Sequence, residues 1–362
     1  MIYFKKLDII IILCIIIIFC IGLLFLYSSS SSLSPGISKT LVTRQLIWFF
    51  FGICLIILIL TIDYQKVIDL SFFLYGLNLI LLVLVLYLGS RKLGAQRWLT
   101  FGGFGFQPSE FIKITFILAL ASYLGHRKDS IESTSNIFIP VILMLPAFIL
   151  IAVQPDLGTA LILVPILISM LFIAGINIKS MILFLSAGFL STPLLWHLLK
   201  DYQKKRLLVF INPNLDPLGA GYTIIQSKIA IGSGRLFGKG WLSGTQSQLN
   251  FLPERHTDFI FSVAGEEWGF IGSVILILVY FIVIYRGIKI IEQTRDFYGK
   301  AIATGIVSLF SFQIIVNIGM TIGLLPVVGL TLPFISYGGS SLIVSMIAIG
   351  ILLNIGMRRP LF

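Results

Sequence analysis

The sequence predicts an all-α polytopic membrane protein with about ten transmembrane helices. Of its 362 residues, 57% are hydrophobic and 11% are charged, and the mean hydropathy is +1.04. Soluble globular domains usually contain about a quarter charged residues. Apolar stretches long enough to cross a bilayer recur along nearly the whole chain, so we expect one membrane-embedded domain, residues 1–362, instead of two soluble domains.

A sliding window of about 19 residues predicts the ten spans. They cover residues 8–27, 45–62, 70–88, 109–125, 137–153, 157–174, 180–199, 264–285, 300–323 and 336–357. We expect helices because backbone amides in hydrocarbon need hydrogen-bond partners within their own segment. Lys5 and Lys6 precede the first span, as in a signal peptide, but no small-residue cleavage pattern follows it, so we expect a retained helix.

The distribution of lysine and arginine predicts that both termini are cytoplasmic. With the N-terminus inside, five basic residues lie in the short outer loops: Lys39, Arg44, Arg91, Lys92 and Arg97. Twelve lie in inner segments: Lys5, Lys6, Lys66, Arg127, Lys128, Lys179, Arg286, Lys289, Arg295, Lys300, Arg358 and Arg359. An even number of spans agrees with this orientation, and we expect the protein in the cytoplasmic membrane.

One long extracytoplasmic loop, residues 200–263, separates the seventh and eighth predicted spans. Its ionisable residues give it a net charge of +4. A basic surface on the outer leaflet suits an anionic headgroup or a pyrophosphate. The alternative is a solvated loop without a ligand. At this location we expect no nucleic-acid partner.

Charged groups at the edges of the spans are costly, which makes them functional candidates. Glu110 and Lys113 are i,i+3 neighbours in the fourth span and can neutralise each other. The pair is compatible with a structural role or with shaping a polar cavity. Asp156 follows Gln154-Pro155 at a tight turn, where it can cap the next helix or face a substrate.

Asp258 is the strongest candidate for chemistry. It lies among Glu254, Arg255, His256 and Thr257, just before the eighth span and on the outer side. Arg255 and His256 would lower its pKa, and an apolar surrounding would raise it. A carboxylate here can deprotonate an acceptor hydroxyl as a general base, and a helix cap is the alternative. Glu266 and Glu267 follow within that span, and we expect one of them to pair with a basic side chain.

Other apparent motifs lack the required pattern. The segment 232–240 is rich in glycine but does not match a phosphate-binding loop, because Lys239 is followed by Gly240 where Ser or Thr is required. Its small residues predict close backbone approach to a ligand or to the membrane surface. The three histidines are far apart and the three cysteines lie in apolar spans, so we expect neither a zinc site nor disulfides.

Several motifs together resemble the SEDS family (shape, elongation, division and sporulation proteins). They are Arg97-Trp98, Gln107-Pro108-Ser109-Glu110, Gln154-Pro155-Asp156-Leu157-Gly158, residues 244–248, residues 252–261 and residues 333–341. They occur in the family's order and extend from the third loop to the last helix. Residues 244–248, the short termini and the length are most similar to the elongation branch, with the division branch as the alternative.

The resemblance implies a ten-helix inverting peptidoglycan glycosyltransferase that polymerises lipid II outside the cytoplasmic membrane during elongation and cell-shape maintenance. Asp258 then corresponds to the essential acid, and Glu110, Lys113 and Asp156 to other motif positions. Arg97, Arg255 and His256 become candidate substrate contacts. The implied partners are a class B penicillin-binding protein transpeptidase and the elongation machinery, and a divalent cation (Mg or Mn) is a possible cofactor without a recognisable metal site.

Two other hypotheses stay open from the sequence. A lipid II flippase would share the basic loop and the Glu110–Lys113 pair, but it does not need a base at the outer surface. Such a transporter typically has inverted repeats or broken helices near the midplane, and no such symmetry is visible. A scaffold that only recruits the transpeptidase would leave the charges in the spans unexplained.

Overall fold

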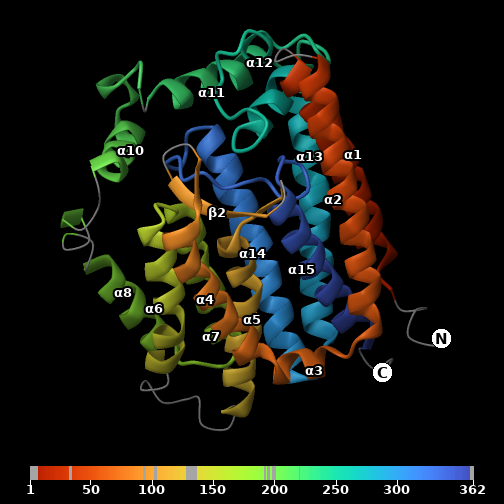
Figure 1. Ribbon diagram of the computed structural model, residues 1–362, viewed down its shortest axis with the longest axis vertical. Coiled ribbons are helices and arrows are strands. Elements are labelled where there is room, and N and C mark those ends of the chain that lie inside the picture. The colour runs from red at the N-terminus through yellow and green to blue at the C-terminus, as the bar shows by residue number, and fades with distance from the viewer. Residues whose placement is uncertain are drawn as a thin grey trace.

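The structure is a computed structural model that describes residues 7–31, 35–92, 95–101, 104–127, 137–190, 193, 196–197, 201–219 and 221–358. Ten helices in these residues match the ten predicted spans (Figure 1). They are α1 (Ile9–Ser31), α2 (Pro35–Thr61), α4 (Ser71–Leu88), α5 (Pro108–His126), α6 (Phe138–Val153), α7 (Leu157–Ile173), α8 (Ile178–Leu190), α13 (Ile260–Gln293), α14 (Phe297–Thr321) and α15 (Gly339–Arg358). The end of the seventh predicted span falls largely outside the described residues.

Six of these helices are long and apolar enough to cross a bilayer, and α6 and α7 are shorter apolar helices. The chain is a multi-pass membrane protein, as predicted. Helix α2 begins ten residues before its predicted span and extends beyond the hydrocarbon, since 27 residues rise about 40 Å. Many apolar side chains on these helices are exposed, as expected for surfaces that face lipid.

Polar contacts show that the start of α1 and the end of α15 lie at the same end of the helix bundle. The short helix α3 (Tyr64–Asp69) connects α2 and α4 there. Arg358 at the end of α15 pairs with Asp63 at 3.0 Å, and Arg286 in α13 pairs with Asp8 before α1. Figure 1 places α10 (Asp201–Ile211), α11 (Tyr222–Ser233) and α12 (Thr245–Gln248) at the opposite end from α3. The predicted topology, with the long loop opposite both termini, is confirmed.

The loop between α4 and α5 forms a small antiparallel sheet that was not predicted from the sequence. Strands β1 (Ser90–Lys92), β2 (Ala95–Phe101) and β3 (Phe104–Phe106) follow in the order β1-β2-β3. Leu99 pairs with Phe106 across the second ladder. The sheet places Arg97, in β2, at the outer end of the bundle.

Helix α13 is broken at Gly269, and the glycine-rich segment 232–240 closes the break. Gly269 has φ +67°, outside the helical region. In an unbroken helix the carbonyls of residues 266 and 267 would pair with the amides of residues 270 and 271. Instead all four bond to this segment: Lys239 N and Gly240 N donate to Glu266 O and Glu267 O (both 3.0 Å), while Phe270 N and Ile271 N donate to Arg235 O (2.9 Å) and Leu236 O (3.1 Å).

These contacts change the interpretation of the glycines. A Cβ on Gly234 would lie 2.0 Å from Gly265 O, and a Cβ on Gly238 would lie 2.1 Å from Glu267 O. The close backbone approach predicted from the small residues is present, but the partner is the α13 backbone and not a ligand or the membrane surface. Glu266 pairs with Lys239 at 2.9 Å, which confirms the prediction that one of the two adjacent acids has a basic partner.

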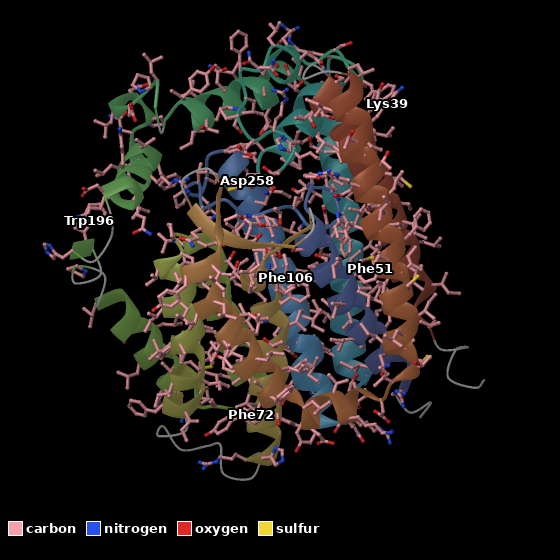
Figure 2. The ribbon with its side chains drawn as sticks, viewed as in Figure 1. Lys39, Phe51, Phe72, Phe106, Trp196 and Asp258 are labelled. Atoms are coloured by element: carbon pink, nitrogen blue, oxygen red, sulfur yellow. The ribbon has the colours of Figure 1, made fainter. Side chains whose placement is uncertain are left out.

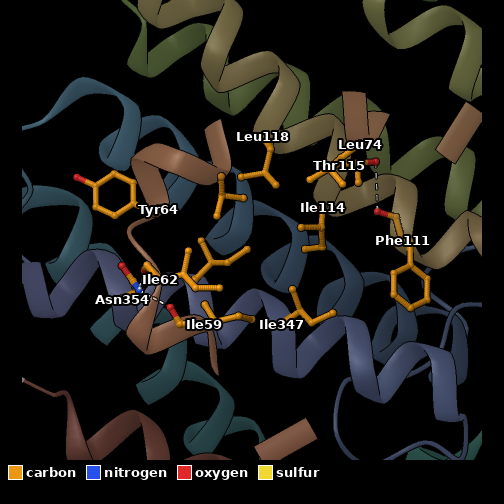
Figure 3. Close-up of a pocket in the computed structure, with 12 residues that line it drawn as sticks. Ile59, Ile62, Tyr64, Leu74, Phe111, Ile114, Thr115, Leu118, Ile347 and Asn354 are labelled. Atoms are coloured by element: carbon orange, nitrogen blue, oxygen red, sulfur yellow. Dashed lines mark hydrogen bonds between the residues drawn. The ribbon is translucent and has the colours of Figure 1, made fainter. Parts of the chain in front are cut away.

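An apolar cavity of about 280 Å³ lies between the helices, away from the long outer loop. Its lining comes from α2, α3, α4, α5 and α15 (Figure 3). Asn354 belongs to this lining, and its Nδ2 donates to Ile59 O (2.6 Å) and Ile62 O (2.7 Å). Most of the lining is hydrocarbon, and no Asp, Glu, His, Lys or Arg is among the described residues that line it, so this cavity is a poor candidate for acid–base catalysis.

Candidate active site

Asp258 lies at the outer end of the bundle, two residues before α13 begins (Figure 2). Its side chain is partly buried. Within the part of the chain that the structure describes, no hydrogen bond or ion pair reaches its carboxylate. The residue beside it is Gly329, where a Cβ would stand 3.3 Å from Asp258 Oδ2. The carboxylate is therefore available to an external group.

The surroundings of Asp258 raise its pKa to about 6. Burial is the largest cause, because desolvation disfavours the charged form. The carboxylates of Glu254 and Asp156 raise the pKa further, while Arg206 and Arg97 lower it. Arg255 and His256 were expected to lower this pKa, but the arginines that act on Asp258 come from α10 and β2. An acid with this pKa is a competent base near neutral pH.

Asp156 joins several elements next to this acid. It caps α7 by accepting from Thr159 N at 3.4 Å, so the predicted capping role is present. Gln107 Nε2 and Ser109 Oγ, at the start of α5, each lie 3.5 Å from Asp156 Oδ2. Arg97 NH1 lies 3.7 Å from Asp156 Oδ1. The Gln-Pro motifs that begin α5 and α7 thus meet at one carboxylate, which also acts on Asp258.

Glu110 and Lys113 form the predicted pair within α5. Lys113 Nζ donates to Glu110 Oε2 at 2.8 Å, and the two residues are 1% and 6% exposed, respectively. Neither charge would be tolerated alone at this burial. Glu110 directly follows Ser109, whose Oγ lies 3.5 Å from Asp156 Oδ2, and Lys113 lies one turn further along α5. The geometry of the pair fits both hypotheses from the sequence, a structural role and the shaping of a polar cavity.

The three other predicted site residues occupy different surroundings. Arg97 donates to the carbonyls of Gln154 and Pro155, which ties the β2 strand to the turn before α7. Arg255 is 5% exposed, and its Nε donates to Ser29 O in α1. Burial lowers the pKa of His256, so its imidazole is neutral at pH 7. Of these three, Arg97 is the one whose charge acts on Asp258.

Arg206 and Glu254 also belong to the site because both act on the pKa of Asp258. Arg206 lies in α10, and its NH1 donates to Val327 O at 3.3 Å. The sequence placed both residues in the basic loop without singling them out. Only a long-range contact, such as that between α10 and residue 327, distinguishes Arg206 from its basic neighbours, and spacing along the chain gives no signal for it.

The described residues do not fit a protein-built metal site. No group of three or more His, Cys, Asp or Glu side chains among them could hold a metal ion. Glu254 and Asp156 act electrostatically on Asp258, but the three described carboxylates are not arranged as a ligand set. The predicted divalent cation therefore stays a prediction, and no chemical step is assigned to it here.

Comparisons with known proteins agree with this architecture. The profile of the cell cycle protein family of FtsW, RodA and SpoVE matches residues 8–360. The chain is 46% identical over 292 residues to the peptidoglycan glycosyltransferase MrdB of Escherichia coli K12, covering 80% of this chain and 78% of that protein. It is 34% identical to the peptidoglycan glycosyltransferase RodA of Treponema pallidum, covering 97% and 98% of the two chains.

Solved structures show the same fold. A chain from a peptidoglycan synthase complex that coordinates polymerisation and crosslinking superimposes with a TM-score of 0.84 at 31% identity, covering 98% of this chain and 99% of that one. The rod shape determining protein RodA of Thermus thermophilus superimposes with a TM-score of 0.73 at 28% identity, covering 98% and 97%. The resemblance predicted from the motifs is confirmed: the chain belongs to the SEDS family of FtsW, RodA and SpoVE proteins.

Proposed function

We propose that this chain polymerises lipid II into glycan strands at the outer face of the cytoplasmic membrane, with Asp258 as the general base. As a family member whose relatives are named peptidoglycan glycosyltransferases, it is a peptidoglycan glycosyltransferase of cell elongation. Lipid II as the substrate and Asp258 as the base are the parts that we propose. The observation that carries this proposal is the Asp258 carboxylate, which is unbonded within the described residues and has a pKa of about 6.

In the proposed step Asp258 accepts the proton of the 4-hydroxyl group of one sugar. The hydroxyl oxygen attacks the anomeric carbon of the next sugar, and the bond from that carbon to the pyrophosphate oxygen breaks. Undecaprenyl pyrophosphate leaves with the bonding electrons, and the configuration at the anomeric carbon inverts. A base with a pKa near the working pH combines a large deprotonated fraction with a useful proton affinity.

Arg97 and Arg206 supply positive charge beside this acid. Their charges act on Asp258 from two different elements, β2 and α10. Negative charge develops on the pyrophosphate as it leaves, and fixed cations stabilise such charge most effectively where water is excluded. We propose these two arginines as the nearest pyrophosphate contacts. In this proposal Glu110, Lys113 and Asp156 shape a polar substrate cavity, Arg255 holds the outer loop against α1, and His256 lines the site as a neutral imidazole.

The proposed partner is a class B penicillin-binding protein that crosslinks the strands, together with the elongation machinery. Support comes from the similar chain in a complex that coordinates polymerisation and crosslinking. The flippase alternative has no comparable support, because a transporter does not require a base with a raised pKa at one surface.

The test is polymerisation of purified lipid II by the purified protein with its cognate transpeptidase. We expect glycan strands from the wild type, none from Asp258→Asn, and wild-type amounts from Asp216→Asn. Asp216 is a matched control because it lies in the same outer loop, where it pairs with Lys205 at 2.8 Å. Full activity in a folded Asp258→Asn protein would refute the general base. Lipid II transport across liposomes without strand formation would favour the flippase.

A further inference from the structure

The main chain around Asp258 is held by the region of α14 and α15. Three consecutive carbonyls, those of residues 256 to 258, each accept one hydrogen bond from it. The pairs are His256 O with Tyr337 N (2.9 Å), Thr257 O with Ser336 Oγ (2.6 Å) and Asp258 O with Asn317 Nδ2 (3.0 Å). Three bonds to three successive residues fix both the position and the direction of this short segment.

Ser336 belongs to the connector, defined as residues 322–338 between α14 and α15, and Asn317 of α14 also bonds to it. Asn317 Nδ2 donates a second bond to Leu330 O at 2.6 Å. Ser336 Oγ accepts from Leu332 N at 2.8 Å while it donates to residue 257. Asn317 is 0% exposed and Ser336 is 5% exposed, so water does not compete for these bonds. Each side chain therefore links the Asp258 segment to the connector.

The connector is itself held by several helices. Gln45 in α2 donates to Ser336 O at 3.1 Å, and Gln313 in α14 donates to Thr331 O at 3.0 Å. Thr331 Oγ1 lies 2.8 Å from Ser341 Oγ in α15. Gly22 in α1 packs so closely that a Cβ there would lie 2.8 Å from the Cα of residue 335. The connector is irregular, but hydrogen bonds and close packing with α1, α2, α14 and α15 make it a rigid support for the Asp258 segment.

We infer that Asn317 and Ser336 are positioning residues that place the Asp258 carboxylate through its main chain. This inference rests on the proposed role of Asp258 as the general base. The carboxylate receives no hydrogen bond from the described residues, so its own contacts do not orient it. Gly329, also in the connector and with φ +74°, lies against the carboxylate, and a Cβ there would stand only 3.3 Å from Asp258 Oδ2. The connector thus fixes the carboxylate's location while its oxygens stay free for the substrate.

Positioning of this kind has a kinetic signature. A reacting group that moves by about 1 Å can lose about a hundredfold in rate, even when the mutation does not touch the substrate. Removing either donor is expected to lower kcat and to leave KM nearly unchanged, because the substrate-binding groups stay in place. The pH at which kcat rises on the acidic side of its pH profile is also expected to shift, because the carboxylate would lie in different surroundings.

The test compares Asn317→Leu and Ser336→Ala with two matched controls. Asn354→Leu removes another buried asparagine (1% exposed) whose Nδ2 also bonds two main-chain carbonyls, but at the opposite end of the bundle. Ser345→Ala removes a serine of α15 that is as buried as Ser336 and whose hydroxyl, among the described residues, bonds only Ser341 O. Initial rates of lipid II polymerisation are measured against pH and normalised to folded protein, which size-exclusion chromatography and thermal melting quantify.

We expect kcat to fall about 10- to 100-fold in Ser336→Ala and Asn317→Leu, with KM within about twofold, and both controls to keep the wild-type kcat. If Asn317→Leu does not fold, Ser336→Ala alone carries the test. The inference would be overturned if Ser336→Ala had the same kcat and the same acidic side of the pH profile as the control Ser345→Ala. Asp258→Asn in the same assay separates the two proposals. If Asp258→Asn is inactive and Ser336→Ala is fully active, the positioning role is refuted and the general base stands. If Asp258→Asn is active, the general base is refuted.

Discussion

At the scale of residues, Asp258 differs from Asp156, Glu110 and Glu266 because its carboxylate has no hydrogen-bond or ion-pair partner among the described residues. Asp156 caps a helix, Glu110 has Lys113, and Glu266 has Lys239. Each of those carboxylates has a hydrogen-bond or ion-pair partner. Asp258 is instead desolvated, next to two other acids, with its carboxylate unbonded within the described part of the chain. Such an arrangement costs stability and is typical of groups retained for chemistry.

This cost predicts a pH-dependent gain in stability for Asp258→Asn. The folded pKa of about 6 lies above the ordinary value of 3.8, so the folded protein binds this proton more tightly than the unfolded chain does. Ionising Asp258 therefore destabilises the fold as pH rises from about 4 through 6, by up to about 3 kcal/mol above that range. The amide cannot ionise, and its apparent melting temperature should exceed that of the wild type at pH 8.

The comparison is made by thermal melting in one detergent at several pH values. The advantage of Asp258→Asn should shrink as pH falls through 6 and vanish near pH 4. Asp216→Asn, in the same loop, should show no such trend. An advantage that is equal at pH 5 and pH 8 would show that ionisation of Asp258 is not the cause.

The Glu110–Lys113 pair predicts strong coupling between two substitutions. Lys113→Met leaves the buried Glu110 without its 2.8 Å partner, which costs roughly 3–5 kcal/mol. Adding Glu110→Gln removes the uncompensated charge, so the double variant should recover most of the folded yield. Fluorescence-detected size-exclusion chromatography measures that yield. Equal losses in the single and double variants would mean that the two residues do not act as a pair.

At the scale of elements, the broken α13 shows how a membrane protein tolerates irregular backbone. The two amides and two carbonyls released at Gly269 all bond to the glycine-rich segment. Unsatisfied groups at this position would each cost several kcal/mol if they faced lipid. Glu266 adds a second link, because it accepts from the amides of Gln246 (2.9 Å) and Ser247 (3.2 Å) at the start of α12. The break, the segment and α12 thus form one unit.

This unit predicts opposite outcomes for two glycine substitutions nearby. Gly238→Ala introduces a Cβ that would lie 2.1 Å from Glu267 O, at a residue with φ +80°, so the segment must move away from α13. We expect the apparent melting temperature to fall by several degrees. Gly232→Ala, in α11, meets nothing within 4 Å and should be neutral or slightly stabilising. Equal melting temperatures for both variants would contradict the close packing.

The sequence predicted the helices better than the segments between them. Ten apolar stretches are a strong signal, and all ten correspond to helices. Strands of three, seven and three residues give almost no periodicity, so the sheet that carries Arg97 was not predicted. Asp258, Asp156 and Arg97 were found from their types and motifs. Arg206, Asn317 and Ser336 were not singled out, because their roles depend on contacts between segments about 60 to 120 residues apart in the chain.

At the scale of the whole molecule, the fold places one chemical surface on one side of the membrane. Figure 2 shows Lys39 near the same end as Asp258 and Phe72 at the opposite end. The twelve-to-five distribution of basic residues predicts that the end with Asp258 is outside. An enzyme at that end meets a lipid-linked sugar but no cytoplasmic nucleotide.

This orientation can be tested with a matched pair of cysteine variants. Lys39→Cys and Lys66→Cys both replace exposed lysines, at opposite ends of the bundle. A membrane-impermeant maleimide applied to intact spheroplasts should label Lys39→Cys and leave Lys66→Cys unlabelled until the membrane is permeabilised. The native Cys14, Cys20 and Cys54 lie within α1 and α2, and their replacement by alanine removes background labelling. The reverse pattern would place Asp258 in the cytoplasm and exclude the proposed reaction.

The measurement that tests the central claim most directly is the pH dependence of kcat/KM for lipid II polymerisation. A general base must be deprotonated, so kcat/KM should rise about tenfold per pH unit below pH 6 and level off above about pH 7. His256→Gln should show the same rise of kcat/KM below pH 6, because ionisation of Asp258, and not of the imidazole, is proposed to cause it. A profile that is flat from pH 5 to 8, or a rise that disappears with His256→Gln, would contradict the assignment of Asp258 as the base.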